Sequence, residues 1–150
     1  MRVWATSLRG VQPPLTVLYD ADCGFCRSAL AALLRLDRDR RLLPVTIQGP
    51  DGERLLGHLT PDQRLASAHV VTPDGRVHSG GDAVVPIARV LPGMGPVAVL
   101  AGTLAGPTRW GYRQVAANRT RLGRLVPQRR RARATEAIAG HRRRVLGPQR

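Results

Sequence analysis

The sequence predicts an α/β domain in which a parallel strand-helix-strand unit is followed by an antiparallel hairpin and further helices. Three observations lead to this fold class. A helical apolar pattern at residues 23–36 lies between two short apolar runs, 15–20 and 42–47. A turn sequence at 73–75 separates two further short segments that read as strands, 67–72 and 76–79. The chain of 150 residues is 43% hydrophobic, which suits one domain with a core of its own.

The first three elements are expected to form a βαβ unit. The run at 15–20 is the first strand, and the run at 42–47 is the second strand, parallel to the first. Pro44 favours an edge position for the second strand, because proline cannot donate to a neighbouring strand. The helix between them carries an apolar stripe with helical spacing: Cys26, Ala29, Leu30, Leu33 and Leu34.

The middle of the chain predicts a short helix around 53–57, another helix and a hairpin. Thr60 begins the second of these helices, since Pro61 follows it and Gln63 completes a capping box. The hairpin pairs residues 67–72 with residues 76–79 in antiparallel orientation, joined by Pro73-Asp74-Gly75.

Three more helices are expected, at residues 83–91, 97–105 and 108–122. The stretch 97–105 is uncharged but far shorter than the ~20 apolar residues that span a bilayer. It therefore predicts a buried or interface helix, with a membrane-surface segment as the alternative. The order β-α-β-(α)-β-β-α is that of a thioredoxin-like core.

Charge is distributed unevenly. All 24 basic residues are arginine, and residues 1–82 hold 10 of them against 9 acidic groups, while residues 83–150 hold 14 against one. We divide the chain into a leader (1–14), a domain (15–125) and an Arg-rich tail (126–150). The tail is expected to be solvated, with a helix across 132–145. It suggests an alternative function, in which a non-enzymatic protein binds nucleic acid or an anionic membrane surface.

The two cysteines of the chain, Cys23 and Cys26, lie where the first strand turns into the first helix. A helix start offers unpaired N–H groups and partial positive charge, which favour a thiolate. Residues i and i+3 share one helical face, so the two sulfurs can exchange a disulfide. We expect Cys23 to be the exposed, attacking sulfur and Cys26, on the apolar stripe, to be the more buried, resolving sulfur.

The spacing of the cysteines and of the histidines argues against other roles for the pair. The spacing closes too small a loop for a structural disulfide to contribute much stability. A zinc site needs about four ligands, and the four histidines form no H-x3–5-H pair. Two inert cysteines remain an alternative. No metal or cofactor is expected, and the chain has no Gly-rich dinucleotide fingerprint. Reducing equivalents would therefore come from an external thiol reductant.

Two acids adjoin the cysteines. Asp22 is expected to cap the helix, whereas Asp20 either accepts the Cys26 proton or holds the turn. Arg27 is the nearby cation. His69 and His78, on the hairpin strands, are given no catalytic role. No secretory signal is evident at the N-terminus, so a cytoplasmic protein is expected, whose cysteines rest mainly as a dithiol.

The chain resembles the DCC family of thiol-disulfide oxidoreductases over roughly residues 15–125. The resemblance rests on Tyr19-Asp20-x-x-Cys23-x-x-Cys26, on the hairpin block from His69 to Val77, and on the block from Tyr112 to Leu122. It implies a thioredoxin-like fold and dithiol–disulfide exchange, in which Asp20, Cys23 and Cys26 are the matching positions. The expected partner in such an exchange is a disulfide-containing protein or a small thiol. Ala21 stands where the family often has glycine.

One departure from the thioredoxins themselves concerns the loop before the third strand. Thioredoxins have a cis-proline there, facing the cysteines. Here the residues before His69 are Ala66-Ser67-Ala68, and Pro61 lies too far back. The backbone that usually docks the substrate is therefore expected to be absent or reshaped.

Overall fold

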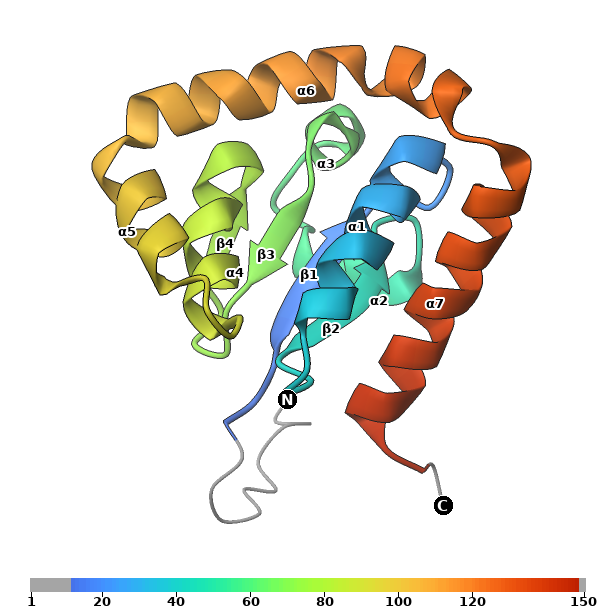
Figure 1. Ribbon diagram of the computed structural model, residues 1–150, viewed down its shortest axis with the longest axis horizontal. Coiled ribbons are helices and arrows are strands. Elements are labelled where there is room, and N and C mark those ends of the chain that lie inside the picture. Colours follow the sequence, from blue (N-terminus) through green and yellow to red (C-terminus); the bar gives the residue numbers. More distant parts are fainter. Residues whose placement is uncertain (1–11, 149–150) are drawn as a thin grey trace.

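The structure is a computed structural model that describes residues 12–148, so most of the expected leader, residues 1–11, lies outside the described part. Four strands and eight helical segments follow one another along these residues, as Figure 1 shows. In chain order they are β1 (Leu15–Tyr19), α1 (Gly24–Leu36), β2 (Leu42–Thr46), α2 (Pro50–Leu55), α3 (Pro61–Ala66), β3 (His69–Val71), β4 (Val77–Ser79), the 3-10 helix η1 (Gly80–Ala83), α4 (Val84–Val90), α5 (Gly95–Thr103), α6 (Ala105–Leu125) and α7 (Gln128–Leu146).

The four strands form one sheet in the order β2-β1-β3-β4. β1 and β2 are parallel, with Leu15 opposite Leu42, and the other two pairings are antiparallel. Pro44 lies on the edge strand β2, as its missing N–H predicted. The predicted fold class is confirmed, because this is a mixed α/β fold of thioredoxin-like type with a βαβ unit joined to a hairpin.

Alternation along the strands divides the core between the two faces of the sheet. Val17 and Val70 pack on the face covered by α1, α4 and α7, whereas Leu18 and Val71 pack on the opposite face, against Leu56 after α2. Successive side chains of a strand point to opposite faces, so a continuous apolar run indicates a strand buried on both. This explains why apolar residues stand at consecutive positions within the runs 15–20 and 42–47.

The middle elements agree with the predictions in kind and differ at their ends. The Thr60 capping box is present, with both of its hydrogen bonds to Gln63. α2 begins earlier than expected, at Pro50, and a 3-10 turn precedes α4. β3 is shorter than the strand expected at 67–72, and before it the N–H of Ala68 donates to the phenol oxygen of Tyr112 at 2.8 Å.

The last two helices, α6 and α7, both contact α1 near the start of the chain. α6 runs across the end of the sheet at which β1 and β2 terminate, and α7 lies beside α1 (Figure 1). The helix expected at 132–145 is longer than predicted, and its packing differs from that of a solvated tail. Ala134, Ile138 and His141 are buried, because these positions form one face of the helix among the arginines. Between residues 12 and 148 no helix combines the length and apolarity needed to cross a bilayer.

Candidate active site

Cys23 and Cys26 are joined by a disulfide at the N-terminus of α1. Their Cα atoms are 5.2 Å apart, and both residues are half-buried, although Cys26 was expected to be the more buried. Cys23 itself is the N-cap residue, and its Sγ accepts the N–H of Cys26 at 3.2 Å. The expectation that Asp22 caps this helix is therefore wrong. A sulfur in this position accepts a hydrogen bond from an otherwise unpaired N–H and lies at the positive end of the helix dipole.

The turn before the cysteines is held by Asp20 and Gln48. Asp20 Oδ1 accepts the N–H of Asp22 at 2.9 Å and the side-chain amide of Gln48 at 2.7 Å. Gln48 Oε1 in turn accepts the N–H of Ala21 at 3.1 Å. Gln48 follows β2, and the parallel pairing of β1 and β2 brings the two carboxyl ends together. Sequence reasoning missed Gln48, although its position just after the second strand was a usable signal.

The two sulfurs face different surroundings. Cys26 lines a mainly apolar cleft of about 270 Å³ together with Phe25, Ile87 and Tyr112. Cys23 lines a separate hollow of about 330 Å³ that is rich in charged side chains. Asp20 and Arg119 line both spaces, so the disulfide lies between an apolar cleft and a polar hollow.

The sequence of this strand-turn-helix region and of the elements around it decides the family. A sequence model described as DCC1-like thiol-disulfide oxidoreductase matches residues 17–125. The chain belongs to this DCC1-like family. No curated protein matches the chain, and neither does any solved structure. The match confirms the resemblance to the DCC family.

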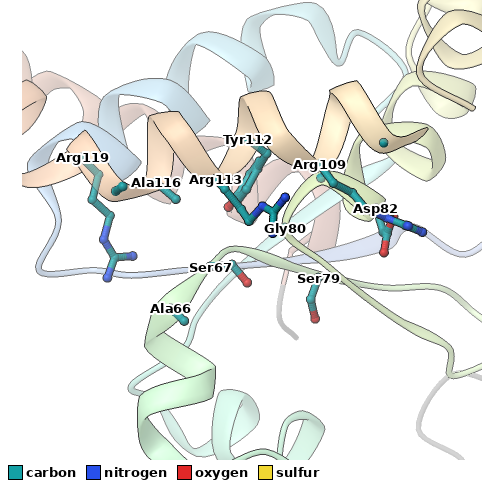
Figure 2. Close-up of a pocket in the computed structure, with 13 residues that line it drawn as sticks. Ala66, Ser67, Ser79, Gly80, Asp82, Arg109, Tyr112, Arg113, Ala116 and Arg119 are labelled. Atoms are coloured by element: carbon teal, nitrogen blue, oxygen red, sulfur yellow. The ribbon is translucent and has the colours of Figure 1, made fainter. Parts of the chain in front are cut away.

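A broader groove of about 750 Å³ adjoins the apolar cleft of this DCC1-like domain. Figure 2 shows Tyr112, Arg113 and Arg119 projecting from α6 toward the loop that contains Ser67. At the other end of the groove, Arg109 Nε is 2.6 Å from the carboxylate of Asp82. α6 therefore forms one wall of both the groove and the cleft.

The loop before β3 is hydrogen-bonded to helix α6 of the same chain. Ala68 lines the Cys26 cleft, and its N–H is bound to Tyr112 of α6. No cis peptide bond occurs in the part of the chain that the structure describes. In the DCC1-like domain, the main-chain segment beside Cys26 thus includes Ala68, whose N–H is already hydrogen-bonded to Tyr112.

Tyr19 and His69 both favour their neutral forms. Burial raises the pKa of Tyr19, which lines the Cys26 cleft, against the opposing charges of Arg142 and Arg27. Burial lowers the pKa of His69, whose ring contacts Ser79 Oγ at 2.7 Å and the Arg64 carbonyl at 2.9 Å. His69 is a packed strand histidine with both ring nitrogens hydrogen-bonded.

Arg131 belongs to the site although it lies beyond the DCC1-like match. Its Nε donates to the Val126 carbonyl at 3.0 Å, and its terminal nitrogen donates to the carbonyl of Gly123. The guanidinium lies directly over Gly24, where an added Cβ would be 2.9 Å from Nε. Arg131 and Cys23 line the same hollow. The sequence assigned this residue to the tail, because nothing in the local pattern indicates that α7 returns to the start of α1.

The described residues do not gather metal ligands. From residue 12 to residue 148, no group of three or more histidine, cysteine, aspartate or glutamate side chains is placed to hold an ion.

Proposed function

We propose that this protein is a thiol-disulfide oxidoreductase of the protein-disulfide reductase type, in which Cys23 attacks and Cys26 resolves. The observation that carries the proposal is the Cys23–Cys26 disulfide at the start of α1, with the Cys26 N–H directed at Cys23 Sγ. In the dithiol form, the same N–H and the helix dipole would stabilise a thiolate at Cys23. A thiolate is the attacking species in disulfide exchange.

The proposed cycle moves two electrons. The Cys23 thiolate attacks one sulfur of a substrate disulfide, forms a mixed disulfide and releases one substrate thiolate. Cys26 then loses its proton and attacks Cys23 Sγ, which closes the Cys23–Cys26 disulfide and releases the second substrate thiolate. An external thiol reductant restores the dithiol by the reverse exchange.

Asp20 is the group we propose as acceptor of the Cys26 proton. It lines the same cleft as Cys26, and its Oδ1 is held by Gln48, which orients the carboxylate. A carboxylate beside a half-buried thiol can remove the proton as the thiol attacks. The turn-holding contacts of Asp20 are compatible with this role, because they use one of its two oxygens.

The test replaces each cysteine in turn and measures reduction of insulin disulfides with a thiol reductant. Cys23→Ser is expected to abolish the activity, whereas Cys26→Ser is expected to leave the first attack intact and to accumulate a mixed disulfide detectable by mass spectrometry. Each variant keeps one thiol and so controls for the other. Full activity in Cys23→Ser would exclude the mechanism.

The proposal includes a direction of exchange, reduction of the substrate, and a location in the cytoplasm. The reduction potential of the Cys23/Cys26 pair distinguishes a reductase from an oxidant, and a low potential is expected for a reductase in the cytoplasm.

Weak contact with polyanions through the exposed arginines of α7 stays a prediction. Salt-sensitive binding to nucleic acid or anionic vesicles would test it.

A further inference from the structure

The hollow in front of Cys23 has walls of opposite charge. Asp20 and Asp22 line it from the turn between β1 and α1. Three arginines line it from the last two helices: Arg119, Arg124 and Arg131. With Cys23 as a thiolate, an incoming sulfur compound would meet both walls.

The acidic wall is already engaged within the chain. The amide nitrogen of Gln48 lies 2.7 Å from Asp20 Oδ1 and 3.5 Å from Asp22 Oδ2, so one side chain draws both carboxylates together. Asp20 also accepts the N–H of Asp22. These contacts hold the two carboxylates beside Gln48, on the strand side of the hollow.

The arginine wall has no such partner. Within residues 12–148, the ion pairs closer than 4 Å include none made by Arg119, Arg124 or Arg131. Arg131 is oriented by two main-chain carbonyls, which accept hydrogen bonds without cancelling its charge. The positive charge beside Cys23 is therefore free to bind an anion supplied by the substrate.

We propose that this hollow recognises a small thiol or disulfide that bears a carboxylate, and that Arg119, Arg124 and Arg131 bind that carboxylate while Cys23 exchanges with the sulfur. The proposal rests on the redox function above and narrows its substrate class. The volume of about 330 Å³ lies in the range of small-molecule sites. The arginines also face the negative charge that spreads over the sulfurs during attack, which favours the transition state.

The step is the first half of the cycle. The Cys23 thiolate forms a bond to one sulfur of the small disulfide, the original S–S bond breaks, and one carboxylate-bearing thiolate leaves. Cys26 then releases the second thiolate as it loses its proton and closes the enzyme disulfide. Two electrons pass from the enzyme dithiol to the substrate, so a single turnover needs no added reductant.

The experiment uses the full chain, reduced beforehand and freed of reductant, against three small disulfides. These are glutathione disulfide, which carries carboxylates, bis(2-hydroxyethyl) disulfide, which is neutral, and cystamine, which is cationic. Each rate is divided by the rate of the same disulfide with dithiothreitol to remove intrinsic reactivity. We expect glutathione disulfide to exceed the neutral compound by on the order of tenfold, cystamine to be slowest, and the spread to shrink in high salt.

Substitution of the arginines tests whether they cause the preference for glutathione disulfide. Arg131→Gln and Arg124→Gln are each expected to lower the rate with glutathione disulfide several-fold more than the rate with the neutral compound. Arg121→Gln is the matched control, because Arg121 is exposed on α6 and does not line the hollow. Arg124 is also exposed and has no hydrogen bond to the core among the described residues, so its variant tests the proposal even if Arg131→Gln is poorly folded.

The outcomes separate this inference from the proposed function. Normalised rates that are equal for the three disulfides, or a preference that survives both arginine variants, would overturn the carboxylate site and leave the redox function in place. A folded, reduced protein that reacts with none of the three would overturn this inference, and failure to reduce insulin as well would overturn the proposed function.

Discussion

The imidazole of His141 donates from Nε2 to the carboxylate of Asp37, at 2.9 Å, across 104 residues of chain. Both side chains are almost fully buried. Asp37 also accepts the N–H groups of Arg41 and Leu42, at 2.8 and 2.9 Å. A single carboxylate thus joins the end of α1, the start of β2 and the C-terminal helix that carries Arg131.

Removal of the His141 side chain should destabilise the protein. In His141→Ala, Asp37 loses a buried hydrogen-bond donor and a cavity forms, so the free energy of unfolding is expected to fall by about 3 kcal/mol. Urea denaturation followed by circular dichroism measures this. His58→Ala, at an exposed histidine, is the control and should change stability by less than ~0.5 kcal/mol. Equal stability of the two variants would show that the pair does not hold α7.

The contact of α6 with the 3-10 turn depends on a glycine. A Cβ at Gly81 would lie 2.7 Å from the Cα of Arg109, a main-chain atom that cannot rotate away. Gly81→Ala is therefore expected to lower the free energy of unfolding by about 2 kcal/mol and to displace α6 from the groove. Gly106→Ala on α6, where nothing lies within 4 Å, should instead be neutral or stabilising by up to ~1 kcal/mol. Thermal unfolding compares the two, and an unchanged melting temperature for Gly81→Ala would contradict the close packing.

The phenol of Tyr112 satisfies a main-chain donor beside the apolar cleft. Tyr112→Phe removes only the oxygen that accepts the Ala68 N–H, so we expect a loss of about 1–2 kcal/mol in the free energy of unfolding and faster amide exchange at Ala68. Trp110→Phe, at an exposed position of the same helix, should leave both quantities nearly unchanged. Hydrogen exchange at Ala68 that is the same in both variants would argue against this bond in solution.

His69 should make stability depend on pH. Burial lowers its pKa in the folded state below the usual value near 6.5, so the unfolded state binds the proton more readily. The contribution of neutral His69 is therefore present above about pH 6.5 and is lost as the pH falls toward the folded pKa. Denaturation at several pH values between 5 and 8 tests this (about the range over which histidine titrates). His69→Gln should flatten the profile relative to His78→Gln on β4, and parallel profiles would contradict the expectation.

Asp20 should act on the second step of exchange rather than the first. Asp20→Asn is expected to slow closure of the Cys23–Cys26 disulfide by at least ~10-fold, so the mixed disulfide accumulates, since the carboxylate no longer takes the Cys26 proton. Stopped-flow mixing with a small disulfide and acid quenching separates the two steps. Asp22→Asn controls for the loss of one negative charge from the same turn. Equal rates of disulfide closure in the two variants would show that Asp20 holds the turn and does not accept the Cys26 proton.

Local patterns were enough for the parts of the site that are contiguous in sequence. The apolar runs at 15–20 and 42–47, the helical stripe that contains Cys26 and the capping box at Thr60 each depend on side chains a few residues apart. Such short-range patterns report strand alternation, helix period and cap chemistry directly. Element ends were less predictable, because a distant group such as the Tyr112 phenol can bind the main chain next to a strand.

The sequence by itself thus determined the fold class, the family and the cysteine pair at a helix start. Only the tertiary structure decided what surrounds that pair: Gln48 from the end of β2, Arg119 from α6 and Arg131 from α7. These contacts join residues dozens to more than a hundred positions apart. Their formation depends on how α6 and α7 pack across the sheet, and composition alone cannot distinguish an arginine in a solvated helix from one held over the first turn of α1.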